Sequence, residues 1–351
     1  MKLLILLLLT TLYASVEARK CRALAFSGGG NLGAYQAAVF IGMTEILPAE
    51  EVTYDVITGV SAGSLNAMGL SAFEPSDVKS AAEFIYSLWD SIPDNKAYGN
   101  WPLGIAEGLF MRSGIFDISP GITWIKKQFG DKTVKRKISL ASVDANNADY
   151  IVTDYNATYT QPDDLIESAF ASSALPGIFD PVVRGEQILI DGGTVWNLDV
   201  ASAIRRCKEV VEDDSDIIVD MILAGSNGSV LDKDTKKELA EMTALEHYMR
   251  GQEIKDFYNI MSDYKSTVKL FPKVDFRYLA FPSKKLSTGV IPLNFNREQI
   301  DICFEAGKQD SAIAIELGAK EYSRVVMEYL EKVSDGEKLS LIDMVEGSRP
   351  Q

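Results

Sequence analysis

Short apolar runs alternate with glycine-rich turns and longer mixed segments along the first part of the chain. Residues 22–26 and 54–58 are apolar strand candidates. Each runs into a glycine turn, and helical segments follow at residues 34–47 and 64–72. Two strand–turn–helix units in succession predict a parallel sheet with helices on its faces.

The same alternation continues further along the chain. Short apolar runs predict strands at residues 137–144, 150–155, 187–190 and 217–223, and at 278–281. Longer patterned segments predict helices at residues 76–92, 165–173, 233–264 and 297–331.

The domain organisation follows from this pattern and from the absence of repeats or breaks in composition. Residues 100–117 are rich in glycine, proline and aromatic residues and predict a long loop. We expect one α/β domain over residues 19–335, a three-layer α/β/α fold with a mainly parallel central sheet. Residues 336–351 are expected to form a loose C-terminal tail.

The first eighteen residues have the pattern of a leader rather than of a folded segment. The apolar run from Leu3 to Leu9 follows a lysine, and Val16 and Ala18 supply small residues for cleavage after Ala18. An uncleaved membrane anchor is the alternative, but the run is short for a span of about 20 residues. We expect a signal peptide at residues 1–18 and a mature protein in the secretory pathway, secreted or lumenal.

Composition excludes one large class of partner. The 351 residues carry 35 Lys and Arg against 50 Asp and Glu, which gives a net charge of −15. Binding to a nucleic acid needs a cationic surface, so no nucleic-acid partner is expected. Docking on anionic lipid by bulk charge is disfavoured for the same reason.

Cysteines and glycosylation motifs bear on the secretory expectation. Cys21, Cys207 and Cys303 leave open either one bridge with one free thiol or three free thiols. Asn156 and Asn227 each begin an N-glycosylation motif, so a glycoprotein is expected. No Cys/His spacing indicates zinc, and no motif implies an organic cofactor.

A candidate nucleophile lies in the turn after the second strand. Gly59 to Gly63 fit the pattern G-x-S-x-G, with Ser61 at its centre, between a strand and a helix. Such a turn exposes the serine hydroxyl beside a helix N-terminus, and glycines at Gly59 and Gly63 leave room for the neighbouring backbone. A plain tight turn with an incidental serine is the alternative.

A nucleophilic serine needs a base, and the chain contains a single histidine, His247. His247 lies in a charged helical segment without a turn signal, so we expect an ordinary helix residue there. The base of Ser61 would then be a carboxylate. Asp191 is the candidate, because it ends a strand before Gly192 and Gly193, although this pattern also occurs in simple turns.

The glycine run after the first strand has two interpretations. Successive N–H groups at Gly28, Gly29 and Gly30 would suit an oxyanion hole for acyl transfer. Gly28, Gly30 and Gly33 also match the dinucleotide pattern G-x-G-x-x-G. That pattern requires an acidic residue at the end of the second strand, where this chain instead has the Ser61 turn.

The ordered set of these blocks resembles the patatin-like phospholipase family. The glycine run, the Ser61 turn and the Asp191-Gly192-Gly193 block occur in the order typical of that family. The segment 171–181 resembles the stretch before the family's aspartate, and residues 295–300 resemble its closing helix.

The resemblance implies a lipid acyl hydrolase with a Ser61/Asp191 dyad, an acyl-enzyme on Ser61 and an oxyanion hole at Gly28, Gly29 and Gly30. The implied substrate is a phospholipid or other acyl lipid, and transient contact with a membrane or micelle surface is compatible with it. The family often has Arg or Lys where this chain has Leu32. A weak or inactive patatin-like storage or lipid-binding glycoprotein is therefore the alternative.

Overall fold

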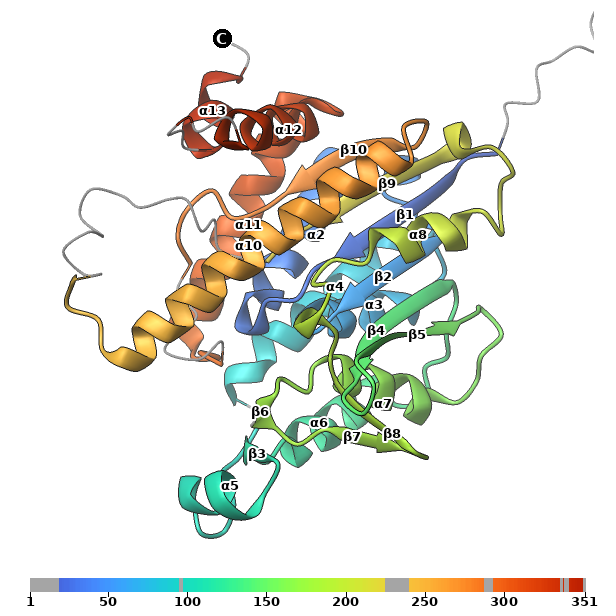
Figure 1. Ribbon diagram of the computed structural model, residues 1–351. Coiled ribbons are helices and arrows are strands. Elements are labelled where there is room, and N and C mark those ends of the chain that lie inside the picture. The colour runs from blue at the N-terminus through green and yellow to red at the C-terminus, as the bar shows by residue number, and fades with distance from the viewer. Residues whose placement is uncertain are drawn as a thin grey trace, which may run out of the picture.

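The computed structural model describes residues 19–94, 97–224, 240–286, 293–334, 337 and 341–349 (Figure 1). The expected signal peptide at residues 1–18 and the motif at Asn227 lie outside the described residues. A central eight-stranded sheet carries helices on both faces, which confirms the predicted α/β class.

The sheet has the strand order β10-β9-β1-β2-β4-β8-β7, and β5 pairs with β4 outside this path. Its parallel part consists of β1 (Cys21–Phe26), β2 (Val56–Val60), β4 (Lys137–Asp144), β9 (Ile217–Ile222) and β10 (Asp275–Ala280). Both β5 (Asp149–Tyr155) and β8 (Gln187–Asp191) run antiparallel to β4, and β7 (Val182–Arg184) runs antiparallel to β8. The sheet is thus mainly parallel, as predicted, with an antiparallel end.

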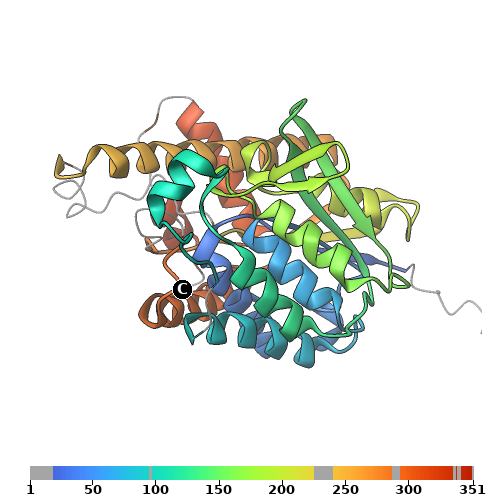
Figure 2. The same cartoon turned by 90° about the horizontal axis from the view of Figure 1, so that it is seen from below.

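Helices of very different lengths cover the two faces (Figures 1 and 2). One face carries α2 (Gly33–Ile46), α3 (Ala62–Ser71), α4 (Val78–Ser91), α6 (Ser119–Phe129), α7 (Pro162–Ser172) and α11 (Arg297–Leu317). The other face carries α8 (Val200–Cys207) and α10 (Ala244–Leu270), and α12 (Glu321–Ser334) lies against β10. Within the described residues, no helix is both long and apolar enough to cross a bilayer.

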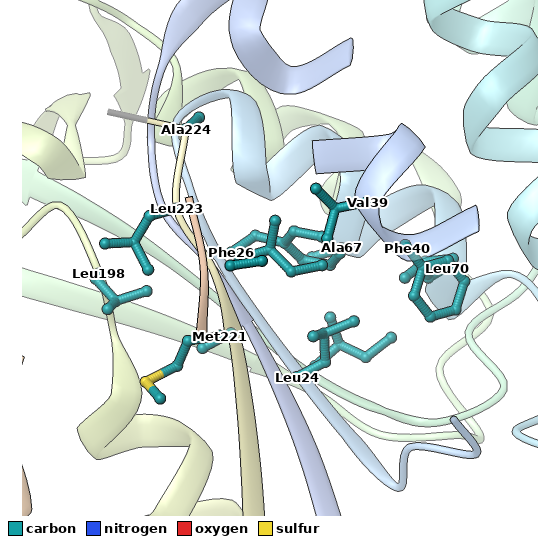
Figure 3. Packing of buried hydrophobic residues seen from close by; sticks show 14 of the residues in the cluster. Leu24, Phe26, Val39, Phe40, Ala67, Leu70, Leu198, Met221, Leu223 and Ala224 are labelled. Atoms are coloured by element: carbon teal, nitrogen blue, oxygen red, sulfur yellow. The ribbon is translucent and has the colours of Figure 1, made fainter. Parts of the chain in front are cut away.

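The core explains the apolar sequence of the central strands. Every residue of β2 is buried, because helices pack on both faces of a parallel strand. Figure 3 shows Leu24 with Val39 and Phe40 on one face of the strands, and Leu198 and Met221 on the other.

One disulfide ties the sheet to a covering helix. Cys21, the first residue of β1, is bonded to Cys207, the last residue of α8. Cys303 is a buried free thiol, and burial raises its pKa to about 12. Of the two arrangements that the sequence left open, the structure has one bridge and one free thiol.

Two expectations from the sequence are wrong in detail. The predicted loop at residues 100–117 contains α5 (Ile105–Met111) and β3 (Gly114–Phe116), which pairs with β6 (Gly177–Phe179). The expected loose tail contains α13 (Leu341–Gly347), where Leu341 and Val345 are buried beside α12. The loop prediction failed because β3 pairs with the distant strand β6, and the tail prediction failed because α13 is short and is held by packing on α12 rather than by a long local pattern.

Candidate active site

Strand register brings Ser61 and Asp191 together. β5 occupies one edge of β4 along residues 138–144, so β2 and β8 share the other edge. β2 ends where Val60 pairs with Ala141, and β8 ends where Asp191 pairs with Ser142. The two strands therefore meet head-on along β4, and the residues at their facing ends become neighbours.

Ser61 has the backbone of a strained turn. Its φ of 52° and ψ of −126° lie outside the regions that a residue with a side chain normally adopts. Its N–H donates a hydrogen bond of 2.9 Å to Ser172 Oγ, which holds this conformation.

The glycines around Ser61 allow close approach of backbone. A Cβ on Gly59 would lie 2.4 Å from the carbonyl oxygen of Gly63. A Cβ on Gly63 would lie 2.5 Å from the carbonyl oxygen of Ser27. Neither neighbour is a flexible side chain, so both positions require glycine, as the sequence pattern indicated.

Asp191 is buried, and both of its carboxylate oxygens and its N–H make hydrogen bonds. Its Oδ2 accepts a hydrogen bond of 2.6 Å from Ser61 Oγ, and its Oδ1 accepts one of 2.7 Å from the N–H of Gly193. Its own N–H donates to the carbonyl oxygen of Ala174, in the segment between α7 and β6. The stretch that precedes the aspartate in sequence thus fixes its position in space.

Burial controls the charge of Asp191. Desolvation raises the pKa of this carboxyl to about 7, although the bonds from Ser61 and Gly193 lower it. The negative charge of Asp256 on α10 raises it further. A carboxylate with a pKa near neutrality is a stronger proton acceptor than an exposed one, and it is still ionised above pH 7.

His247 has no place in this arrangement. It lies exposed on α10 and is not among the residues that line the cavity beside Ser61. Because Ser61 Oγ bonds directly to Asp191, no imidazole lies between the hydroxyl and the carboxylate.

The glycine turn after β1 differs from the expectation at one residue. The N–H of Gly28 lies 3.1 Å from both the carbonyl oxygen and the Oδ1 of Asn197, so this donor is occupied. The N–H groups of Gly29 and Gly30 have no acceptor among the residues that the structure describes. The predicted set of three N–H donors is therefore reduced to Gly29 and Gly30.

Asn197 is a site residue that the sequence reasoning missed. A Cβ on Gly28 would lie 2.2 Å from Asn197 Oδ1, and a Cβ on Gly193 would lie 2.5 Å from the same atom. Asn197 therefore joins the glycine turn after β1 to the turn that follows Asp191. Its position four residues after Gly193 was the available signal, but nothing in a single sequence shows that its side chain turns back.

A cavity of about 470 Å³ lies beside these groups. Gly28, Gly29, Gly30, Ser61 and Asp191 all line it. Most of its remaining wall is apolar and includes Leu32, Leu65, Trp89, Ile92, Trp124, Ile125, Phe170, Phe179 and Phe295. Among the described residues, no cluster of His, Cys, Asp and Glu could hold a metal ion.

Comparison with known proteins gives the family. Residues 24–204, just over half of the chain, match the patatin-like phospholipase family. The chain belongs to that family of lipid hydrolases. The matched range includes both glycine turns, Ser61, Asp191 and Asn197.

Comparisons with individual proteins add little. No curated protein matches the chain. Among solved structures, VipD from Legionella pneumophila is similar at 9% identity and a TM-score of 0.37, covering 94% of this chain and 79% of that one. The heterodimeric complex ExoU–SpcU from the type III secretion system of Pseudomonas aeruginosa is similar at 14% identity and a TM-score of 0.30, covering 94% and 65%. Scores this low contribute nothing to the description of the site.

Proposed function

We propose that the protein hydrolyses fatty-acyl esters of lipids through Ser61 and Asp191, as a phospholipase A or lysophospholipase. The observation that carries this proposal is the bond of 2.6 Å between Ser61 Oγ and Asp191 Oδ2, on a strained turn that faces an apolar cavity. Membership of the patatin-like phospholipase family supports the lipid substrate.

The chemistry has two halves. In the first, Asp191 takes the proton of Ser61 as Oγ attacks the ester carbonyl, and the alcohol leaves with that proton while an acyl-enzyme forms. In the second, Asp191 takes a proton from water, which attacks the acyl-enzyme and releases the fatty acid. Ser61 then regains its proton from Asp191.

Each attack places negative charge on the carbonyl oxygen. Gly29 and Gly30 line the same cavity as Ser61, and their N–H groups have no acceptor among the described residues, so they are the available donors to that oxygen. The N–H of Gly28 donates to the carbonyl oxygen and to the Oδ1 of Asn197, and these bonds hold the turn in place before substrate arrives.

The apolar wall accounts for the acyl half of the substrate. Trp89, Phe170 and Phe295 come from separate segments and enclose the space beside Ser61. Burial of an alkyl chain against such a wall is favourable by about 0.8 kcal/mol per methylene. The cavity therefore favours a long acyl chain over acetyl.

The test is hydrolysis of a fluorescent phosphatidylcholine by the purified protein and two variants. We expect Ser61→Ala to abolish hydrolysis, and Asp191→Asn to reduce kcat by about 10²- to 10⁴-fold because the general base is lost. Ser71→Ala, at the far end of the helix that begins after Ser61, is the control, because the Ser71 hydroxyl bonds only the carbonyl oxygen of Met68 among the described residues. Undiminished hydrolysis by either variant removes that residue from the mechanism.

A weak or inactive lipid-binding protein is the second candidate, because Leu32 is buried where the family often has a cation. A fluorophosphonate probe separates the two. Labelling of the wild type that Ser61→Ala abolishes demonstrates a reactive nucleophile, whereas no labelling of either protein favours the inert alternative.

We also propose that residues 1–18 are a cleaved signal peptide and that the protein acts in the secretory pathway. The bridge between Cys21 and Cys207 supports this, because disulfides persist in oxidising compartments. N-terminal sequencing of protein expressed in secretory cells should begin at Arg19. A mature N-terminus at Met1 would overturn the cleavage.

A further inference from the structure

Residues 99–117 form an arm that leaves the wall of the cavity and returns to it. Tyr98 and Ile118 both line the cavity, and Gly99 and Asp117 between them exchange two backbone hydrogen bonds of 2.8 and 2.9 Å. The arm contains α5 and projects at the foot of the molecule in Figure 1. Figure 2 looks onto the side from which it projects.

The arm is braced from within. Trp101 Nε1 donates a hydrogen bond of 3.0 Å to the carbonyl oxygen of Gly114, and the guanidinium of Arg112 lies 4.4 Å above the Trp101 ring. Gly108 packs against Ile115 so closely that a Cβ would lie 2.3 Å from its carbonyl oxygen. These contacts hold α5 in a defined place.

The polarity of α5 is the reverse of that of an ordinary surface helix. Its acidic residue Glu107 is buried, while Phe110 is 84% exposed and Met111 is 71% exposed. Leu103, Ile105 and Leu109 are exposed as well. An apolar cluster of this kind on a protein surface marks an interaction site.

The charges at the tip of the arm cancel. Between residues 99 and 116 the sequence contains one acid, Glu107, and one base, Arg112, and the further acid Asp117 lies at the base of the arm. Arg112 donates hydrogen bonds of 2.7 and 2.9 Å to Glu107 Oε1, and the N–H of Leu103 donates one to Oε2. The Leu103 N–H and the guanidinium keep the pKa of Glu107 below its ordinary value, so the pair stays ionised and neutral overall.

We propose that this arm, residues 99–117, is a lipid-docking element that inserts its apolar side chains into the surface of zwitterionic or neutral lipid. The inference rests on the proposed function, because a lipid surface is where the substrate lies. On a chain of net charge −15, a neutral apolar tip suits insertion among uncharged head groups rather than attraction to anionic ones. The base of the arm at Tyr98 and Ile118 adjoins the cavity, so docking delivers lipid beside Ser61.

The experiment measures vesicle binding without turnover. Full-length Ser61→Ala protein is floated with phosphatidylcholine vesicles, alone and with Phe110→Glu, Met111→Glu or Leu270→Glu added. Met111 and Leu270 are a matched pair, because each is 71% exposed and each is the last residue of its helix. We expect Phe110→Glu and Met111→Glu to weaken binding by about tenfold or more, and Leu270→Glu to leave it unchanged.

A second measurement reports insertion directly. Phe110→Trp should show quenching by brominated phosphatidylcholine beyond that of the four native tryptophans, and Leu270→Trp should not. With Ser61 intact, Met111→Glu should lower the ratio of vesicle-lipid to soluble-ester hydrolysis by about tenfold.

Three outcomes overturn the proposal. Equal flotation of Met111→Glu and Leu270→Glu removes the arm from lipid binding, and absence of quenching at Phe110→Trp removes insertion. Light scattering that shows a wild-type dimer dissociated by Phe110→Glu assigns the surface to a second copy. Failure of the proposed function is seen separately, as vesicle binding by a wild-type protein that hydrolyses neither substrate.

Discussion

The two glycine turns after β1 and β2 are neighbours at the carboxyl edge of the sheet, yet they differ in which polar groups are left available. One leaves backbone N–H groups available, and the other leaves a side-chain hydroxyl. After β1, the hydroxyl of Ser27 points inward, where it accepts a bond from the N–H of Ala224, while the N–H groups of Gly29 and Gly30 have no acceptor among the described residues. After β2, the N–H of Ser61 is bonded to Ser172 and its side chain faces Asp191. One kind of local element thus leaves either its backbone N–H groups or a side-chain hydroxyl available at the site, depending on which of its polar groups is already bonded.

Gly29→Ala should distort the turn after β1 while leaving the turn after β2 intact, and it has the largest expected effect. A Cβ at this position would lie 2.3 Å from the Cβ of Ala224, so the turn must shift. The shift changes the direction in which its N–H groups point. We expect kcat for ester hydrolysis to fall by about 10²- to 10³-fold, as for loss of an oxyanion donor. Gly251→Ala, where a Cβ meets open space, is the control. Full activity of Gly29→Ala would exclude this turn from catalysis.

The turn after β2 faces Asp191, and ionisation of this buried carboxyl lowers the stability of the folded protein. The turn after β1 faces no such group among the described residues. The folded-state pKa of Asp191 is raised to about 7, whereas an aspartate in the unfolded chain loses its proton near about pH 4. Between these two values the folded protein therefore holds a proton that the unfolded chain has already released. The stability contributed by this proton is present at low pH and is lost as pH rises through 7.

Asp191→Asn removes that ionised group. At pH 8 we expect the free energy of unfolding in urea to rise by about 1–4 kcal/mol over the wild type. At pH 4, where Asp191 is protonated, the difference should vanish. A variant that is less stable at pH 8 would contradict the raised pKa.

Asn197→Ala should weaken the link between the turns without breaking it. The carbonyl oxygen of Asn197 still accepts the N–H of Gly28, so only the two side-chain bonds with Gly28 are lost. We expect kcat to fall by about tenfold with little change in KM, since the proposed oxyanion donors, the N–H groups of Gly29 and Gly30, are less well held. Asn147→Ala, in the exposed turn after β4, should leave both constants unchanged. A change confined to KM would point instead to a role in binding substrate.

The smallest expected effect concerns the acidic residues of α10. Activity should fall about tenfold per pH unit below about 7, because Asp191 must be ionised to accept the proton. Asp256 raises the pKa of Asp191, so Asp256→Asn should move this limb of the pH profile to lower pH. Asp263→Asn, two turns further along α10 and outside the cavity lining, is the control. An unshifted profile in Asp256→Asn would show that solvent screens the pair.

Much of the site could be read from local pattern, because strand, glycine turn and helix are coded by adjacent residues. Gly59, Ser61 and Gly63 are at the turn where the sequence put them, and the exclusion of His247 followed from its helical setting. The direction of β8 could not be read, since a short apolar run pairs equally well in either sense. The occupied N–H of Gly28 and the pairing of β3 depend on contacts with distant residues, Asn197 and β6, which no local pattern reveals.

β4 carries neither the proposed nucleophile nor its base, yet its pairing with β2 and β8 sets the distance between Ser61 and Asp191. Val60 and Asp191 are matched to consecutive residues of this strand, Ala141 and Ser142. Removing or adding one residue there would slide one partner by about 3.3 Å and turn its side chain to the opposite face of the sheet. What β4 contributes to the arrangement of Ser61 and Asp191 is therefore its length rather than a side chain at the site.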